Sequence, residues 1–356
     1  MIDPDAFAAL LCDYCLEVSE RQQVIVVTTT LAESLVRSLH GALLERGAWP
    51  LIRISLPDQP RDFFARAREW QLDEFAPMEL IEVETADAYV RIDAPADTQA
   101  LANVDPDRVI RSVRAREPVQ RIRLTKRWCG TIWPTAALAQ QARMPEHEYA
   151  AFLNGALFLD RDDPVAAWDD LYERQQLLAD RLARASQIRI EADGTDLRLT
   201  VAGRTWINSD GRRNMPSGEV FTGPHEDSAE GTIRFTIPSN RQGAEVRDVE
   251  LTFSGGRVVG ARAQRGEEML VSALETDSGA RFLGELGIGT NPGIDRATGS
   301  TLLDEKIAGT VHLALGRSYP ETGGLNDSAL HWDLICDLRE GGRLTADGEP
   351  VEIPGP

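Results

Sequence analysis

The sequence contains no long apolar segment. A helix that crosses a membrane needs about 20 consecutive apolar residues, and no run in the 356 residues approaches that length. The first 15 residues, MIDPDAFAALLCDYC, also lack the basic start and apolar stretch of a secretory signal peptide. The sequence therefore predicts a cytoplasmic protein that has no membrane partner.

Basic residues are scarce relative to acidic ones. Lys and Arg number 38 against 57 Asp and Glu, which gives a formal net charge of -19. Nucleic acids and anionic membranes are bound through basic patches, so this balance argues against both as partners. Internal repeats and low-complexity segments are absent as well, and the length is sufficient for two globular domains.

Cysteine is rare, with four residues in the chain. Cys12 and Cys15 form a CxxC motif, but no second pair lies at the spacing of a zinc site. The motif lies in an apolar helical pattern with no strand before it, which argues against a thioredoxin-like redox role. We expect Cys12, Cys15, Cys129 and Cys336 to be buried or partly buried free thiols, as is usual in the cytoplasm.

The first half of the chain alternates between strand-like and helix-like segments. Apolar runs predict strands at 23–29, 50–56, 87–94 and 128–134, and helical spacing predicts helices at 31–48, 62–72 and 105–117. Such alternation is typical of a parallel sheet in a three-layer α/β arrangement. No GxGxxG motif follows the first strand, so the sequence does not indicate nucleotide binding.

The pattern changes near residue 186. Residues 146–186 are mostly helical, whereas residues 187–206 alternate and contain the turn pairs Asp-Gly and Ala-Gly, which predict antiparallel hairpins. We therefore predict an α/β protein of two domains. Residues 1–186 form a three-layer, Rossmann-like parallel-sheet domain, and residues 187–356 form a mixed α/β domain.

Acidic residues and histidines recur in apolar or glycine-rich stretches of the second half. His331 and Asp333 are separated by one Trp, so in a strand they point to the same face. Glu219, Glu285 and His312 lie in similar surroundings, where a carboxylate is costly to bury unless it is paired or binds a cation. Carboxylates with imidazoles suit Zn, Co, Mn or Mg, and this number of ligands suits two ions better than one.

Each of these residues also has a simpler interpretation when it is taken alone. A single His on an apolar strand is more often a hydrogen-bonded core residue than a metal ligand, and a Glu beside Gly is usually exposed. The metal hypothesis depends on their occurring together between residues 219 and 333.

Five segments of this half resemble the M29 family of metallopeptidases, the thermophilic aminopeptidase T and aminopeptidase S group. They are MPSGEVFT, HEDSAEGT, GELGIGTN, DEKIAGTVHLALG and ALHWDL, in the order of that family. The resemblance implies that the C-terminal domain carries a co-catalytic pair of divalent cations. It also implies peptides with a free N-terminus as substrates, and a homodimer as the assembly.

The resemblance implies six metal ligands, which are Glu219, Glu285, Glu305, His312, His331 and Asp333. Glu285 corresponds to the ligand that bridges the two ions and so takes part in catalysis. The ions would activate a water, and one of them would hold the α-amine of the peptide. The group that protonates the leaving amine is not identified; an unliganded oxygen of Glu285 or Glu219 is a candidate.

Tyr319, seven residues after His312, corresponds to a catalytic tyrosine of that family. In that role its hydroxyl would donate a hydrogen bond to the developing oxyanion. Without that role it would be an ordinary residue of the core or of the site wall.

Two other functions remain open. Ring-cleaving dioxygenases of dihydroxypyridines share EDSAEGT and a HxD pair and use one Fe(II), but Glu219, Glu285 and Glu305 favour the two-metal peptidase. A metal- or peptide-binding protein without catalysis is the second alternative. The EDSAEG segment either orients ligands or braces a loop, His225 has no assigned role, and Lys306 neutralises either a carboxylate or a charge on the substrate.

Overall fold

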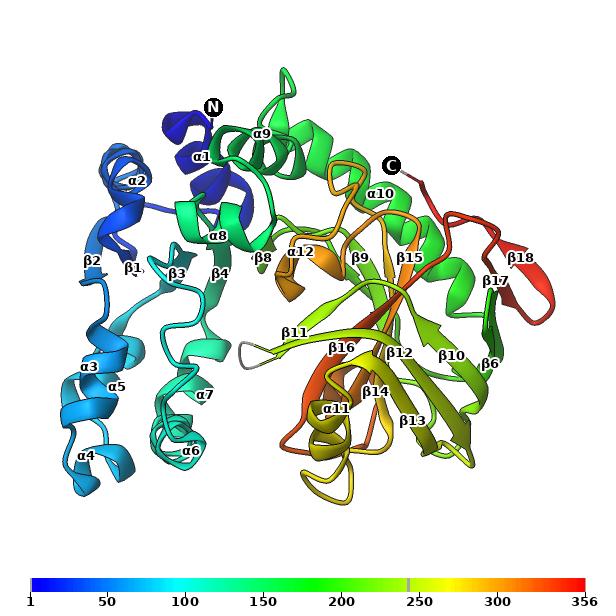
Figure 1. Cartoon of the computed structure of the whole chain (residues 1–356). Helices are drawn as coiled ribbons and strands as arrows, with labels where there is room; N and C mark the ends of the chain where they lie inside the picture. The colour runs from blue at the N-terminus through cyan, green and yellow to red at the C-terminus, as the bar shows by residue number, and fades with distance from the viewer. Residues whose placement is uncertain (1, 242–243, 356) are drawn as a thin grey trace. The chain divides into compact units, whose positions relative to one another are not determined.

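The structure, a computed structural model, describes residues 2–241 and 244–355 and forms two compact units (Figure 1). Unit 1 consists of Met1–Val165 and Gly211–Pro216, and unit 2 of Ala166–Asp210 and Ser217–Pro356. Both units combine helices with sheets, which confirms the predicted α/β class. Within the described residues, no helix is long and apolar enough to cross a membrane.

Unit 1 is built on a five-stranded parallel sheet, sheet A, in the order β2-β1-β3-β4-β8. Its strands are β1 (Gln23–Thr29), β2 (Trp49–Ser55), β3 (Ala88–Asp93), β4 (Arg127–Ile132) and β8 (Asn214–Met215). Strand β1 lies between β2 and β3, and its Val24, Ile25 and Val26 are all buried. Burial on both faces explains why this strand contains an unbroken apolar run at residues 24–27. The predicted parallel sheet is confirmed.

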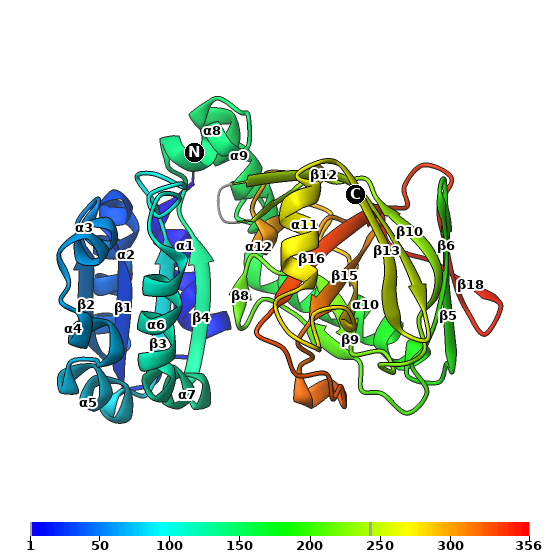
Figure 2. The same ribbon diagram turned by 60° about the horizontal axis from the view of Figure 1, so that its bottom comes forward.

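Helices precede, connect and follow strands β1 to β4 of sheet A along the chain (Figure 2). They are α1 (Pro4–Leu10), η1 (Leu11–Cys15), η2 (Thr30–Ala32), α2 (Glu33–Glu45), α3 (Gln59–Arg66), α4 (Glu69–Asp73), α5 (Pro77–Thr85), α6 (Pro106–Ala115), α7 (Glu117–Thr125), α8 (Ala136–Gln141) and α9 (Glu146–Ala156). Asp3 and Asp105 begin α1 and α6, because each carboxylate accepts a backbone N–H of the first turn. The helix predicted at 62–72 is split between α3 and α4, since Ala67 has an extended backbone.

Unit 2 contains an eight-stranded antiparallel sheet, sheet B. Seven of its strands follow the order β11-β12-β10-β6-β5-β17-β18, and the eighth, β13, pairs with β12. Its strands are β5 (Gln187–Ala192), β6 (Thr195–Thr200), β10 (Glu230–Phe235), β11 (Ser239–Arg241), β12 (Ala244–Ser254), β13 (Arg257–Arg265), β17 (Arg343–Ala346) and β18 (Glu349–Val351). Strands β5 and β6 form the hairpin predicted at Asp193-Gly194. The hairpin predicted at Ala202-Gly203 is wrong, because the chain turns there and joins the other sheet of unit 2.

That other sheet, sheet C, is antiparallel in the order β16-β15-β14-β9-β7. Its strands are β7 (Ile207–Ser209), β9 (Glu219–Thr222), β14 (Leu283–Gly289), β15 (Thr310–Gly316) and β16 (His331–Asp337). Apolar residues of sheets B and C, of α10 (Pro164–Leu182) and of α11 (Glu267–Leu274) form one core. The short α12 (Thr301–Asp304) precedes β15, and η3 (Pro320–Thr322) follows it.

The division of the chain differs from the predicted boundary at residue 186 in two places. Helix α10 belongs to unit 2, because Leu178 and Leu182 pack in the core of that unit. Strand β8 pairs with β4, so residues 211–216 return to unit 1. Neither the packing of α10 nor the pairing of β8 can be predicted from composition. A helical pattern does not indicate which sheet the helix covers, and a two-residue strand has no periodicity.

The cysteine prediction is confirmed. Cys12, Cys15, Cys129 and Cys336 all lie within the described residues, and all four are buried free thiols. Burial raises the pKa of Cys12 and of Cys336 to about 12, so both stay protonated and unreactive at neutral pH.

Candidate metal centre

One face of sheet C carries five of the six predicted ligands, which are Glu219, Glu285, His312, His331 and Asp333. Residues that pair across antiparallel strands share a face, as do alternate residues along one strand. Glu285 of β14 pairs with Ala314 of β15, and Ala314 pairs with Asp333 of β16. His312 and His331 lie two residues before Ala314 and Asp333, so the register brings all of them to the same face.

The other face of these strands is apolar. Its residues include Val220, Leu286, Ile288, Val311, Leu313, Leu315, Trp332 and Leu334, all of which belong to the core of unit 2. Strands β14 and β15 are therefore buried along their whole length, although they alternate between core residues and polar or small ones. The apolar face fixes the register, because a slip of one residue would turn the carboxylates into the core.

Glycines on β14 make room for the polar groups. A Cβ at Gly287 would lie 2.0 Å from Nε2 of His312, so the imidazole covers the strand at this position. A Cβ at Gly289 would lie 2.2 Å from the carbonyl oxygen of Ile307. The GELGIG sequence thus lets both the histidine and the segment after α12 approach the strand closely.

Two groups of potential ligands form, and they share one residue. Glu219, Glu285 and His312 form the first, and Glu285, His331 and Asp333 the second, with all ligand atoms of a group within 4.8 Å of one another. His312 Nε2 lies 3.3 Å from Oε2 of Glu219 and 3.3 Å from Oε1 of Glu285. His331 Nε2 lies 3.7 Å from Oε2 of Glu285 and 3.6 Å from Oδ2 of Asp333. The two oxygens of Glu285 therefore face different histidines.

The imidazole of His331 is oriented by the backbone. Its Nδ1 lies 2.8 Å from the carbonyl oxygen of Arg317, which accepts a hydrogen bond when Nδ1 carries the proton. The lone pair of Nε2 is then directed toward Glu285 and Asp333. A hydrogen bond from the second nitrogen to a carbonyl is the usual support of a metal-binding histidine.

The pKa values in the cluster are displaced by burial and by neighbouring charges. Burial raises the pKa of Glu219 and of Glu285. Burial, with the charge of Glu305, raises that of Asp333 to about 6. Burial alone would lower the pKa of His312, but its hydrogen bond with Glu285 and the charge of Glu219 raise it to about 9. The carboxylates thus crowd together in a place that disfavours their charged form.

The residues of the cluster fit a divalent metal. Oε2 of Glu219 is buried and has no hydrogen-bond partner among the described residues, although it faces Nε2 of His312. Buried, unpaired carboxylate oxygens are rare unless they bind an ion. Oxygen donors mixed with imidazole nitrogens form the ligand set of Zn, Mn and related cations.

Glu305, the sixth predicted ligand, lies beside the cluster at the end of α12. Within the described residues it belongs to neither group of three. Its Oε1 accepts a hydrogen bond from Nζ of Lys306, and that ammonium also lies 3.4 Å from Oε1 of Glu219. The charge of Glu305 still raises the pKa of Asp333.

Tyr319 lies at the rim of the cluster. Its ring centroid is 5.2 Å from that of His331 in an edge-to-face arrangement and 5.7 Å from that of Phe221. The residue as a whole is 42% exposed. Partial burial, together with the charges of Glu285 and Asp333, raises the pKa of its hydroxyl above the ordinary value, so the group stays protonated.

The EDSAEG segment braces loops in this structure. Glu226 accepts hydrogen bonds from Arg204 at 2.9 and 3.1 Å and from the backbone N–H of Leu325 at 2.7 Å. His225 Nε2 lies 2.9 Å from the carbonyl oxygen of Ala202, and the carboxylate of Glu230 accepts a hydrogen bond from a backbone N–H. Of the two interpretations left open by the sequence, these contacts favour bracing.

Sequence reasoning missed Gln175 of α10. Its amide nitrogen donates to the carbonyl oxygens of Glu219 at 3.1 Å and Ser209 at 3.2 Å, and its amide oxygen accepts from Thr290 at 3.0 Å. It thereby ties the helix to the strand that carries Glu219. The available signal was a single polar residue in the apolar stripe of a helix, among Leu171, Leu178 and other buried positions.

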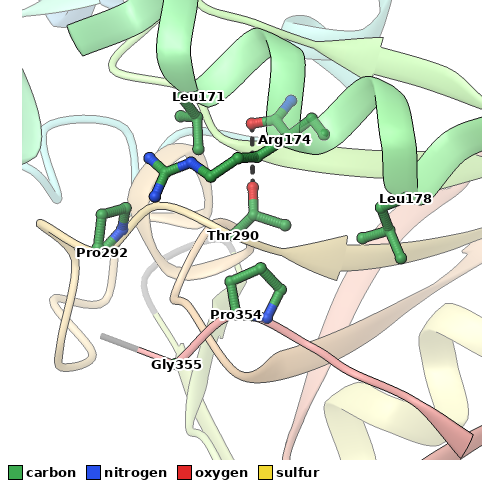
Figure 3. A pocket seen from close by; sticks show the side chains of 8 residues that line it. Leu171, Arg174, Leu178, Thr290, Pro292, Pro354 and Gly355 are labelled. Atoms are coloured by element: carbon green, nitrogen blue, oxygen red, sulfur yellow. Dashed lines mark hydrogen bonds between the residues drawn. The ribbon is translucent and has the colours of Figure 1, made fainter.

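A small pocket next to Gln175 is not part of the cluster. Figure 3 shows Leu171, Arg174, Leu178 and Thr290 around it, with Pro292, Pro354 and Gly355 completing the lining. None of the candidate metal ligands lines this pocket.

This buried set of carboxylates and imidazoles is suited to divalent metal ions. The family model described as thermophilic metalloprotease (M29) matches residues 3–354. Aminopeptidase 2 of Geobacillus stearothermophilus is 31% identical over 402 residues, which cover 98% of this chain and 95% of that protein. Aminopeptidase T of Thermus aquaticus is 32% identical over 375 residues, with 91% and 90% covered. The chain therefore belongs to the M29 family of metallopeptidases, which are hydrolases acting on peptide bonds.

Solved structures agree with this assignment. Wild-type AmpT from Thermus thermophilus superimposes with a TM-score of 0.83 at 27% identity, and the match covers 99% of this chain and 98% of that one. The 2,5-dihydroxypyridine dioxygenase of Pseudomonas putida KT2440 has a TM-score of 0.61 at 16% identity, with 100% and 97% covered. The second likeness is one of fold alone. The resemblance to the M29 family that the five sequence segments indicated is thus confirmed.

Proposed function

We propose that this metallopeptidase removes N-terminal residues from peptides and that it uses two divalent ions, Zn, Co, Mn or Mg. The proposed ligands are the six predicted residues, Glu219, Glu285, Glu305, His312, His331 and Asp333. The observation that carries the proposal is the position of Glu285, whose Oε1 faces His312 and whose Oε2 faces His331. A carboxylate shared between two groups of ligands is suited to bridge two ions.

Divalent cations in such a site supply Lewis acidity, which activates water and polarises a carbonyl group. The protein contributes a buried support for the cluster, since strands β14 and β15, which carry Glu285 and His312, are buried along their whole length. As the resemblance to the family implies, one of the ions would hold the free α-amine of the peptide through its lone pair, which favours cleavage at the first residue over cleavage within a chain.

Tyr319 is the proposed donor to the developing oxyanion. Its pKa is raised, so the phenol keeps its proton at neutral pH and can donate a hydrogen bond. Its contact with His331 places the ring beside the second group of ligands. A donor that meets the oxyanion acts mainly on the transition state.

Hydrolysis of Leu-p-nitroanilide tests this function. Metal-free protein is supplied with Co(II) or Zn(II), and the release of p-nitroaniline is measured. The rate with this substrate is compared with the rate on the same compound with its amine acetylated. We expect turnover of the free amine only, and two metal equivalents per chain by elemental analysis. Oxygen uptake on a dihydroxypyridine with Fe(II), without peptide hydrolysis, would instead identify a dioxygenase. Metal-dependent binding of peptides without release of any amino acid would identify a non-catalytic protein.

The predicted homodimer and the cytoplasmic location remain predictions. Light scattering coupled to size-exclusion chromatography tests the first: a mass twice that of the 39.2 kDa chain supports it.

A further inference from the structure

Lys306 is a fully buried lysine beside the candidate metal centre. The exposed fraction of its side chain is 0%, which is exceptional for this residue type. Its ammonium lies 3.4 Å from Oε1 of Glu219 and donates a hydrogen bond to Oε1 of Glu305. Because a buried charge is costly unless it is paired, the two carboxylates explain how the ammonium is tolerated there.

The backbone of this segment is fixed against sheet C. The N–H of Lys306 donates to the carbonyl oxygen of Leu303, and its own carbonyl oxygen accepts from the N–H of Asn291, both at 3.1 Å. The missing side chain of Gly289 allows this approach, since a Cβ there would lie 2.9 Å from the carbonyl carbon of Lys306. The ammonium therefore extends from a rigid point, and it can in turn fix what it touches.

The contact gives the two oxygens of Glu219 different surroundings. Oε1 faces the ammonium of Lys306, whereas Oε2 faces Nε2 of His312 at 3.3 Å and has no hydrogen-bond partner among the described residues. Glu305 uses Oε1 on the same ammonium. One oxygen of each carboxylate is thus held by the ammonium, and Oε2 of Glu219 is left without a hydrogen bond on the side of His312.

We propose that Lys306 is a positioning residue that holds Glu219 and Glu305 in the orientation in which they bind metal. The inference rests on the proposed metal-dependent function and adds to it a residue that touches neither metal nor substrate. Burial excludes a contact between Lys306 and the peptide, so of the two roles left open by the sequence it neutralises carboxylates.

Metal affinity provides the first test. Lys306→Met removes the ammonium and keeps a long side chain, and Co(II) is titrated into metal-free full-length protein by calorimetry. We expect affinity for at least one of the two ions to fall about 10- to 100-fold, the usual effect of losing a residue that orients a ligand. Lys306→Arg keeps the charge and should recover part of the loss. Wild-type affinity in Lys306→Met overturns the proposal.

Stability of the metal-free protein provides a second test that involves no bound ion. In EDTA, Lys306→Met should lower Tm because Glu219 and Glu305 lose their buried counter-charge. Adding Glu305→Gln should recover part of that loss, since one unpaired carboxylate is then removed. Strictly additive effects in this double-mutant cycle would show that Lys306 acts by packing alone and overturn the proposal. If Lys306→Met does not fold, Lys306→Gln replaces it with the same outcomes.

The two proposals fail in distinguishable ways. Wild-type protein that binds no divalent ion refutes the proposed function itself. Wild-type protein that binds two ions, together with a Lys306→Met variant that binds them equally well, refutes only the role of Lys306.

Discussion

The imidazole of His312 lies on top of Gly287, a residue of the neighbouring strand with which it pairs. A Cβ at Gly287 would be 2.0 Å from Nε2 and 2.2 Å from Cε1 of that ring. Only a glycine at this position allows the imidazole to approach β14 so closely, with its Nε2 3.3 Å from both Glu219 and Glu285. The absence of one side chain thus determines the position of another residue's nitrogen.

Gly287→Ala is expected to displace His312 and so to abolish most metal binding and peptidase activity. The contact is with the body of a buried ring that cannot move away cheaply, so we also expect a loss of about 1–3 kcal/mol in the free energy of unfolding. Metal content and urea denaturation measure the two effects. Gly41→Ala serves as control, because Gly41 lies inside α2 with nothing within 4 Å of its Cβ position. Normal metal content in Gly287→Ala would contradict the proposed part of His312.

Glu285→Gln is expected to weaken the binding of both ions, because the two oxygens of Glu285 face different groups of ligands. Asp333→Asn should weaken mainly the binding of the ion held by the second group, Glu285, His331 and Asp333. Elemental analysis after dialysis at a fixed free Zn(II) concentration distinguishes the two variants. Glu230→Gln, an exposed acidic residue outside both groups, should retain the wild-type content. Equal losses in Glu285→Gln and Asp333→Asn would argue against a shared ligand.

Tyr319→Phe is expected to lower kcat about 100-fold or more while metal content and KM change little. Loss of one donor to an oxyanion has an effect of about this size, and the phenyl ring preserves the contacts with His331 and Phe221. Steady-state kinetics on Leu-p-nitroanilide separates kcat from KM. An unchanged kcat would show that Tyr319 only forms part of the wall.

The metal-free protein should lose stability as pH rises through the range of the buried carboxyls. The pKa of Asp333 is raised to about 6 in the folded state, so the folded protein holds this proton more tightly than the unfolded chain. Its contribution is fully present below the unfolded pKa of about 4 and is lost as pH rises through 6. Asp333→Asn, which cannot ionise, should therefore gain stability relative to wild type, by on the order of 1 kcal/mol or more between pH 4 and pH 8.

Thermal unfolding in EDTA at several pH values measures this difference between the two proteins. Saturating Zn(II) should raise the Tm of the wild type more at pH 8 than at pH 5, because metal binding requires deprotonated ligands. A difference between wild type and Asp333→Asn that is the same at pH 4 and pH 8 would contradict the raised pKa.

The sequence was sufficient for much of the fold, and five of the six ligands that it predicted lie together on sheet C, whereas Glu305 belongs to neither group of three. The segment 23–29, which contains the apolar run 24–27, predicted β1 to the residue, because a strand buried on both faces needs no alternation. The single Trp between His331 and Asp333 placed both side chains on one face of β16. The sequence did not predict that α10 packs in unit 2, nor that the turn at Ala202-Gly203 leads into another sheet, because neither feature depends on the local residue pattern.

By itself the sequence determined which side chains are available for metal chemistry and which family uses them, because residue type and strand period are local properties. Only the tertiary structure decided how they meet: Glu285 between two histidines, Glu219 and Glu305 on the ammonium of Lys306, and Gln175 on the backbone of Glu219. These contacts join segments that are far apart in the chain. Their geometry is set by strand register and core packing, which no short stretch of sequence contains.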